Sequence, residues 1–207
     1  MAKLKAPLLS LGASGAIAKA LVFFPWKGLN VVREYVIPAN PKTALQQQQR
    51  AWLTAAVADI HAAQAHATNP MLPADITAYA LWASVVKAAT TWFNQAVKNW
   101  VDVARVPKTP TVYRGGSTSP GAGNFGIYLY SDEAGAPGHI TAGKFFYGTS
   151  KTALINSQVA TIAWATESIS ATIAGLTAGT KYYAQFRPDV GENCEGANSG
   201  IYHETPN

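Results

Sequence analysis

The segment from Leu176 to Phe186, with the sequence LTAGTKYYAQF, constrains the fold of this chain more than any other stretch. Leu176, Gly179 and Tyr182 have the spacing of a tyrosine corner, in which a tyrosine begins a late strand of a β-sandwich and its hydroxyl bonds to backbone a few residues upstream. Gly179 permits the turn before that strand. Period-two alternation then predicts that Tyr182, Ala184 and Phe186 face a core.

The strand pattern extends over the whole back half of the chain. Runs of strand composition are separated by Gly, Pro and Ser, and they cover Thr111–Arg114, Phe125–Ser131, Lys144–Gly148, Ala153–Trp164, Ser168–Ala174, Lys181–Pro188 and Gly200–Glu204. They predict a β-sandwich with mobile loops at 115–123 and 190–199. On this pattern, residues 107–207 resemble a fibronectin type III or immunoglobulin-like domain. The resemblance implies a binding module without saying what is bound.

The front half has a different pattern. Residues 1–41 are expected to form an extended arm, because glycines break any helix and Pro38 and Pro41 stop continuation. Helical spacing of apolar residues predicts one helix over about 42–68 and another over about 73–104, joined as an antiparallel hairpin. A Pro-rich linker follows. The expected fold is therefore α+β, with an arm and helical attachment domain at 1–106 and an all-β sandwich at 107–207.

The charge distribution favours protein partners. Charged residues make up 13% of the chain, about half the usual share, which suggests a surface partly buried in an assembly. Residues 1–106 hold ten Lys/Arg against four Asp/Glu, and residues 107–207 hold six against seven. The cations are scattered singly rather than gathered in a stripe, so nucleic acid is not the indicated partner.

The sequence offers little that indicates catalysis, a metal or a cofactor. Cys194 is the one cysteine, which excludes an intrachain disulfide and is expected to be a free thiol in a loop. His61 and His66 are five residues apart on a predicted helix, so they do not share a metal by the i, i+4 rule. The acidic residues Asp132, Glu133, Glu192 and Glu195 fall in predicted loops, where solvation is more common than a calcium site or a glycosidase pair. We therefore expect a protein that is not an enzyme and needs no cofactor.

The first residues do not read as a membrane or secretion signal. Lys3 and Lys5 precede an apolar run, but Pro7, Gly12 and Lys19 interrupt it. No clean hydrophobic segment precedes a small-residue cleavage site, and no stretch approaches the length of a membrane span. The expectation is a protein made in a cytoplasm, without a membrane partner.

A second informative region runs from Trp26 to Gln46, with the sequence WKGLNVVREYVIPANPKTALQ. This Trp-Lys-Gly, Val-Arg, Pro-x-Asn-Pro and Gln-rich run after a Gly-rich opening resembles virion-associated proteins of tailed bacteriophages, over about the first fifty residues. The resemblance implies a protein built into a phage particle. Physically, Trp26 is an anchor of the kind that carries interface energy, and Lys27 and Arg33 offer charge-assisted contacts.

The predicted function is therefore that of a structural virion protein. Its predicted protein interface consists of Trp26, Lys27, Arg33, Tyr35, Arg50 and Trp52. The predicted partners are other virion proteins, with a homo-oligomer in the particle, and the alternative for Trp26 and Tyr35 is packing on the helices. The alternative function is a carbohydrate-binding or host-adhesion module, in which Tyr128, Tyr130, Phe146 and Tyr147 would present aromatic faces to a surface glycan.

Overall fold

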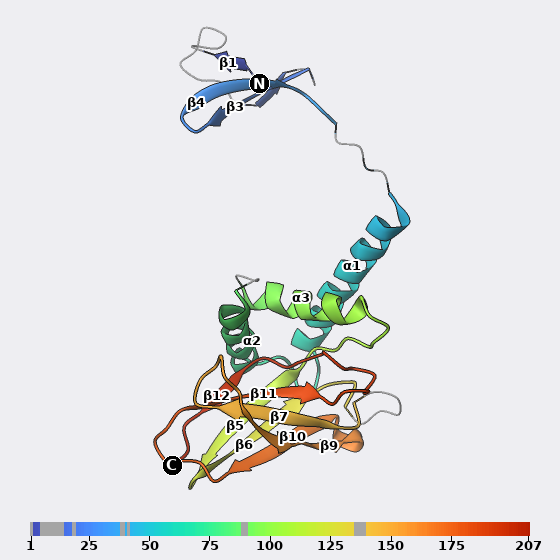
Figure 1. Ribbon diagram of the computed structural model, residues 1–207. Coiled ribbons are helices and arrows are strands. Elements are labelled where there is room, and N and C mark those ends of the chain that lie inside the picture. Colours follow the sequence, from blue (N-terminus) through green and yellow to red (C-terminus); the bar gives the residue numbers. More distant parts are fainter. Residues whose placement is uncertain are drawn as a thin grey trace. The chain divides into compact units, whose positions relative to one another are not determined.

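The computed structural model describes residues 2–4, 15–17, 20–37, 40, 42–87, 91–134 and 140–207. The chain divides into two compact units, unit 1 at residues 1–43 and unit 2 at residues 44–207. Unit 1 holds a small antiparallel sheet, and unit 2 holds three helices and two antiparallel sheets (Figure 1). The class is therefore α+β, as expected.

Unit 1 is a folded sheet rather than an extended arm over its described residues. Its four strands, β1 (Ala2–Leu4), β2 (Gly15–Ile17), β3 (Leu21–Trp26) and β4 (Leu29–Glu34), lie in the order β1-β4-β3-β2. Lys27 and Gly28 connect β3 to β4 with φ of 48° and 77°. Two consecutive positive φ values suit a tight hairpin turn. The arm prediction was wrong because this turn lets two apolar runs pair with each other.

Unit 2 begins with three helices where the sequence predicted two. They are α1 (Ala44–Gln64), α2 (Pro73–Val86) and α3 (Trp92–Ala104). Lys87 ends α2 in the left-handed conformation with φ of 56°, and the Thr91 side chain caps α3 by accepting a hydrogen bond from the Asn94 N–H at 3.2 Å. The helical hairpin is corrected to a three-helix cluster, because these two end signals divide the long apolar pattern.

The helices share a core that absorbs most of their aromatic side chains. Ile60, Tyr79 and Trp100 lie at its centre, and Trp52, Trp82 and Trp92 pack half-buried against it. The Trp100 indole N–H donates to Asp59 at 2.7 Å. None of the described helices has the length and apolar character needed to cross a bilayer.

The back half of unit 2 forms two four-stranded antiparallel sheets, consistent with a sandwich. One sheet has the order β5-β6-β10-β9 and the other β12-β11-β7-β8. The strands are β5 (Arg114–Gly121), β6 (Asn124–Tyr130), β7 (Gly143–Gly148), β8 (Asn156–Val159), β9 (Thr161–Ala163), β10 (Ser168–Ala174), β11 (Tyr182–Pro188) and β12 (Tyr202–Glu204).

Alternating side chains of these strands make one core. Every second residue of β6 and β10 points inward, and β7 and β11 contribute from the other sheet; the buried members are Phe125, Ile127, Leu129, Ile169, Ala171, Ile173, Phe145, Ala184 and Phe186. The rings of Phe145 and Phe186 lie 5.3 Å apart. Burial of such side chains is the main favourable term in folding.

Two strand predictions need correction. Residues 115–121 were expected in a mobile loop, but they belong to β5, and the ladder with β6 shifts register between Arg114 and Ser117. Gly115, with φ of 58°, accommodates this irregularity. The predicted run Ala153–Trp164 becomes β8 and β9, which pair in different sheets on either side of Ala160.

The predicted tyrosine-corner residues lie at the start of β11. The Tyr182 hydroxyl accepts a hydrogen bond from the Thr177 backbone N–H at 3.2 Å. Gly179 has φ of 72°, and Leu176 packs half-buried against the sandwich core together with Tyr182. This contact joins the turn to the strand, as in a tyrosine corner.

The compact units divide at residue 43, whereas the sequence placed a domain boundary at 106–107. The predicted linker, which begins at Val106, is hydrogen-bonded to the loop between β11 and β12. The Thr109 N–H donates to the Asn193 carbonyl at 2.8 Å, and the Lys108 ammonium donates to the Glu192 carbonyl at 2.8 Å. These bonds also pack the 190–199 segment, which was expected to be a mobile loop. Ala78 of α2 and Val103 of α3 belong to the sandwich core.

Asp75, near the start of α2, joins the helices to the sheets. Its carboxylate is buried and accepts hydrogen bonds from the Leu72 N–H at 2.7 Å, the Gly116 N–H at 2.9 Å and the Tyr202 hydroxyl at 2.5 Å. Leu72 precedes α2, Gly116 lies in β5 and Tyr202 in β12. One carboxylate therefore caps a helix and fixes it against two strands from different sheets.

Cys194 is a free thiol in the loop between β11 and β12, as expected, and its side chain is buried in the sandwich core. Burial raises the pKa of its thiol to about 11. Because the thiolate is the reactive form, we expect the native protein to react with a thiol reagent at pH 8 about a hundredfold more slowly than an ordinary cysteine. Spectrophotometric titration with Ellman's reagent, with and without denaturant, measures this. Equal rates in the two conditions would contradict the buried position.

Candidate functional site

Both faces of the unit 1 sheet are apolar. Residues paired across β3 and β4 share a face, so one face carries Val22, Phe24, Trp26, Leu29, Val31 and Arg33, and the other carries Leu21, Phe23, Pro25, Asn30, Val32 and Glu34. Among the residues of unit 1 whose side chains are described, only Phe23 and Val31 are buried. Antiparallel sheets usually keep one polar face in water. Over its described strands β3 and β4, this sheet has no such face.

The predicted interface residues of unit 1 lie along its hairpin. Trp26 is the last residue of β3 and is 55% exposed, and Lys27 follows it in the turn. The Arg33 guanidinium lies over the Phe24 ring at 5.4 Å from its centroid. Tyr35 is half-buried, and its N–H donates to the Ala20 carbonyl at 2.8 Å. Trp26, Lys27 and Arg33 are therefore accessible side chains, while Tyr35 closes the hairpin's end.

The other two predicted interface residues lie in α1, in unit 2. Arg50 has an exposed side chain, and its carbonyl accepts a hydrogen bond from the Thr54 hydroxyl at 3.0 Å. Trp52 packs half-buried against the helical core. The six predicted residues are therefore divided between two units, and Trp52 has a packing role.

The net charge of the whole chain resides in unit 1. Residues 1–43 contain Lys3, Lys5, Lys19, Lys27, Arg33 and Lys42 against Glu34, which gives +5, the value for the entire chain. Residues 44–207 contain ten Lys/Arg and ten Asp/Glu. A basic unit with two apolar faces has the chemistry of a docking element for an acidic, partly apolar surface.

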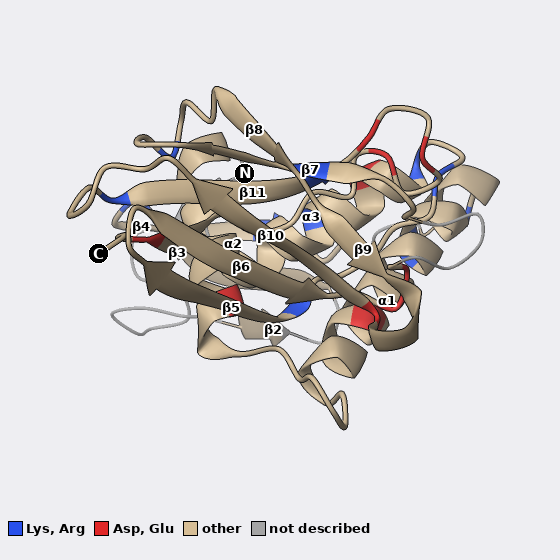
Figure 2. Ribbon diagram, turned by 90° about the horizontal axis from the view of Figure 1, so that it is seen from below, with Lys and Arg blue, Asp and Glu red and all other residues tan. Residues whose placement is uncertain are grey.

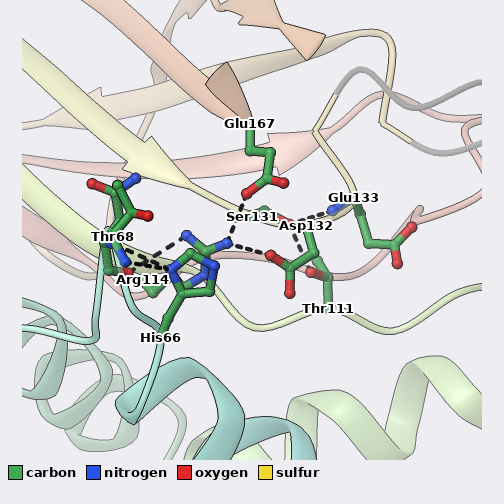
Figure 3. Close-up of polar contacts among 9 residues, drawn as sticks. His66, Thr68, Thr111, Arg114, Ser131, Asp132, Glu133 and Glu167 are labelled. Atoms are coloured by element: carbon green, nitrogen blue, oxygen red, sulfur yellow. Dashed lines mark hydrogen bonds and ion pairs between the residues drawn. The ribbon is translucent and has the colours of Figure 1, made fainter. Parts of the chain in front are cut away.

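A polar cluster at one end of the sandwich is centred on Arg114 (Figure 3). Its guanidinium is 1% exposed and pairs with Asp132 and, at 2.9 Å, with Glu167. Asp132 follows β6 and Glu167 precedes β10, in the left-handed conformation with φ of 52°. Because both carboxylates reach solvent while the cation is buried, the cluster clamps three segments of the sandwich together.

His66 approaches the same carboxylates from the segment after α1. One ligand atom from each of His66, Asp132 and Glu167 falls within 4.8 Å of the others. However, His66 Nδ1 accepts hydrogen bonds from the N–H groups of Thr68 at 3.4 Å and Asn69 at 3.2 Å. A neutral imidazole that accepts at Nδ1 carries its hydrogen on Nε2 and has no lone pair left for a metal. The geometry therefore favours a hydrogen-bonded ion-pair cluster over a metal site.

A shallow pocket adjoins this cluster. It has a volume of about 540 Å³ and is lined by His66, Thr68, Asn69, Tyr130, Ala165, Thr166 and Glu167. Tyr130 is the one Phe, Tyr or Trp side chain in this lining. A carboxylate, an amide and an aromatic ring around a pocket are groups that suit a polyhydroxylated ligand.

The four aromatic residues proposed as a sugar platform do not share a face. Tyr128 and Tyr130 alternate with the inward residues of β6, so they lie on the outer face of one sheet. Phe146 lies on β7 in the other sheet, under the guanidinium of Arg187 at 4.7 Å, and Tyr147 packs on the core. Of the four, Tyr130 alone lines the pocket.

The sequence did not predict the buried ion pairs of Arg114, the contacts of Asp75 with the sheets or the position of His66. His66 was expected on a helix that ends instead at Gln64, and Asp132 was expected to be solvated in a loop. The partners of these residues lie far away in the chain, so no local spacing reveals them. The one local signal was a charged residue, Arg114, directly before a Gly-Gly pair at the start of a strand.

Two comparisons with known proteins found no match for this chain. No protein-family model matches it, and no curated protein is similar to it in sequence.

Proposed function

We propose that this protein is a non-enzymatic structural component of a tailed-bacteriophage particle, either a capsid decoration protein or a head–tail accessory. Unit 1 docks on other virion proteins, and the sandwich of unit 2 is displayed outward. The observation that carries the proposal is the composition of unit 1: two apolar faces, two buried described side chains and the chain's entire net charge. A unit of about forty residues normally needs a partner for stability.

The sandwich supports the display role. The orders β5-β6-β10-β9 and β12-β11-β7-β8 correspond to strands A-B-E-D and G-F-C-C′ of an immunoglobulin-like domain. The tyrosine contact at the start of β11 falls where strand F begins in such domains. The finer assignment to a fibronectin type III-like or immunoglobulin-like sandwich rests on these two features.

The chemistry of unit 1 indicates its partner. Trp26 and Leu29 lie opposite each other and are 55% and 45% exposed. Arg33 is on the same face. An aromatic anchor beside a cation is a common centre of binding energy. We therefore propose that the partner is an acidic protein surface with an apolar pocket on the particle.

Charge reversal tests this partner. Replacing Lys27 and Arg33 together by glutamate is expected to weaken binding to particles assembled without the protein by at least about tenfold, because two attractions become repulsions. Co-sedimentation of the purified chain with such particles measures it. The matched control is Lys98→Glu with Asp102→Lys, which reverses an exposed helical ion pair in unit 2. Equal binding by the charge-reversed protein and the unaltered chain would contradict an acidic partner.

The pocket beside Tyr130 favours a second candidate function, recognition of a surface glycan. Its lining includes Asn69, Tyr130 and Glu167, and Arg114 fixes Glu167 through a 2.9 Å ion pair. Binding of a soluble sugar that Tyr130→Ala abolishes, with loading onto particles unchanged, would favour this adhesion role alongside the structural one.

A further inference from the structure

The outer edges of the two sheets of unit 2 meet in one continuous segment. β8 is the last strand of the order β12-β11-β7-β8, and β9 is the last of the order β5-β6-β10-β9. Ala160 alone separates them in the chain. Among the described residues, no strand pairs with the outer side of either one. The segment 152–166 therefore presents unpaired backbone groups along one side of the sandwich.

This edge carries no charged residue or proline that would hinder pairing with another chain. Natural edge strands carry charged side chains, proline or bulges that prevent pairing with another chain. Residues 152–166 contain no Lys, Arg, Asp, Glu or Pro, and the ribbons of β8 and β9 are free of charged positions in Figure 2. Ile155, Val159 and Trp164 are 83%, 66% and 59% exposed. Exposed apolar side chains on an unpaired edge are typical of an association surface.

The charges that flank the segment are engaged elsewhere. The Lys151 ammonium donates to the Ser84 hydroxyl at 2.9 Å, and Glu167 pairs with Arg114 at 2.9 Å. An approaching strand would therefore meet an uncharged edge, in which polar Asn156, Ser157 and Gln158 lie between the exposed apolar side chains of Ile155 and Val159. Such an edge offers nothing that selects an acidic or a basic partner.

We propose that this edge binds a second copy of the same chain, through antiparallel pairing of residues 156–163 with their counterpart. An antiparallel pair of identical strands has two-fold symmetry, so one patch satisfies both copies. Unit 2 carries ten Lys/Arg and ten Asp/Glu, so two copies of it have no net repulsion. Two copies of unit 1, each with a charge of +5, would repel each other. Self-association is therefore assigned to the edge of unit 2 and not to the docking element.

The contact is expected to be weak in dilute solution. β8 has four residues and β9 has three, so the pairing is at the small end of specific interfaces. A dissociation constant of roughly micromolar or weaker follows. Within a particle, where neighbouring subunits hold the copies close together, the high effective concentration would favour the pairing. This inference stands on unit 2 alone and does not depend on the proposed docking of unit 1.

Sedimentation equilibrium of the full chain over a range of concentrations tests the proposal. The unaltered chain is expected to dimerise reversibly. Ile155→Lys with Val159→Lys is expected to weaken dimerisation by at least about tenfold. The two-fold axis lies between positions 159 and 160, so the charges at position 159 of the two copies come close together, and the charge at position 155 replaces an exposed apolar side chain at the end of the edge. The control is Val190→Lys, which alters a side chain that is 91% exposed between β11 and β12, and its dimerisation is expected to stay unchanged.

Thermal unfolding of all three proteins checks that the exposed substitutions leave the fold intact. A chain that stays monomeric throughout the concentration range would overturn the proposal. Equal association of the edge variant and the unaltered chain would also overturn it, since another surface such as unit 1 would then be responsible. Equal weakening by the edge variant and by Val190→Lys would overturn it as well.

Discussion

Replacing Asp75 by alanine is expected to lower the free energy of unfolding of unit 2 by about 3 to 5 kcal/mol. The carboxylate is fully buried and accepts hydrogen bonds from Leu72, Gly116 and Tyr202. Alanine would leave the buried Gly116 N–H and the Tyr202 hydroxyl without an acceptor, and α2 would lose its cap. Chemical denaturation of the full chain, followed by tryptophan fluorescence, measures the change.

Asp102→Ala is the matched control for this substitution. Asp102 is also a helical aspartate with a cation beside it, Lys98 at 2.5 Å, but its side chain is 46% exposed. Exposed pairs contribute about 0 to 1 kcal/mol, so a small effect is expected. If Asp75→Ala costs no more than Asp102→Ala, then Asp75 does not hold the helices on the sheets.

The pH dependence of the Asp75 effect has a definite sign. Burial raises the pKa of the Asp75 carboxyl above its ordinary value of 3.8, and the hydrogen bonds from Tyr202, Leu72 and Gly116 oppose this. The folded state then holds the proton more tightly than the unfolded chain does. The raised pKa of Asp75 therefore adds to the free energy of unfolding below pH 3.8, and this added stability is lost as the pH rises through the raised pKa. The destabilisation by Asp75→Asn should therefore be larger in acid than at neutral pH.

Several strands could be predicted because their side chains alternate around one core. Phe125, Ile127 and Leu129 of β6 repeat every second residue, and β10 behaves alike. In β11, Ala184 and Phe186 face the core as predicted, although Gln185 between them is also buried. β5 could not be predicted in this way, since its sequence RGGSTSPG has few residues that favour strands. Its pairing with β6 and the close approach of Gly116 to Asp75 decide its structure. Tertiary contacts here override local preference.

The division of the helical region into three helices could not be predicted from local sequence either. The apolar stripe from Trp82 to Val103 is continuous in sequence, and neither Gly nor Pro interrupts it. The ends at Lys87 and Thr91 depend on a left-handed residue and a threonine cap, which are weaker signals than periodicity. The candidate sites were less predictable still. Trp26 and Arg33 were identified from their types, but only the strand register places them on one face.

Removing residues 1–43 is expected to abolish incorporation of the protein into phage particles. The cores of unit 2 draw on residues from Trp52 to Tyr202, so the truncated chain should keep the unfolding transition of unit 2. Full-length Val190→Lys, altered at an exposed position of unit 2, is the control and is expected to incorporate normally. This design separates loss of the docking element from loss of the fold.

The most direct test of the structural-protein account is the copy number of residues 44–207 in purified particles, measured by quantitative mass spectrometry against the full-length chain in the same infection. The account predicts that full-length protein is present in the particles and that the truncated protein is absent, although it is folded and abundant in the cell. Truncated protein at the full-length copy number would contradict the assignment of unit 1 as the docking element. Absence of the full-length chain from the particles would contradict the virion role itself.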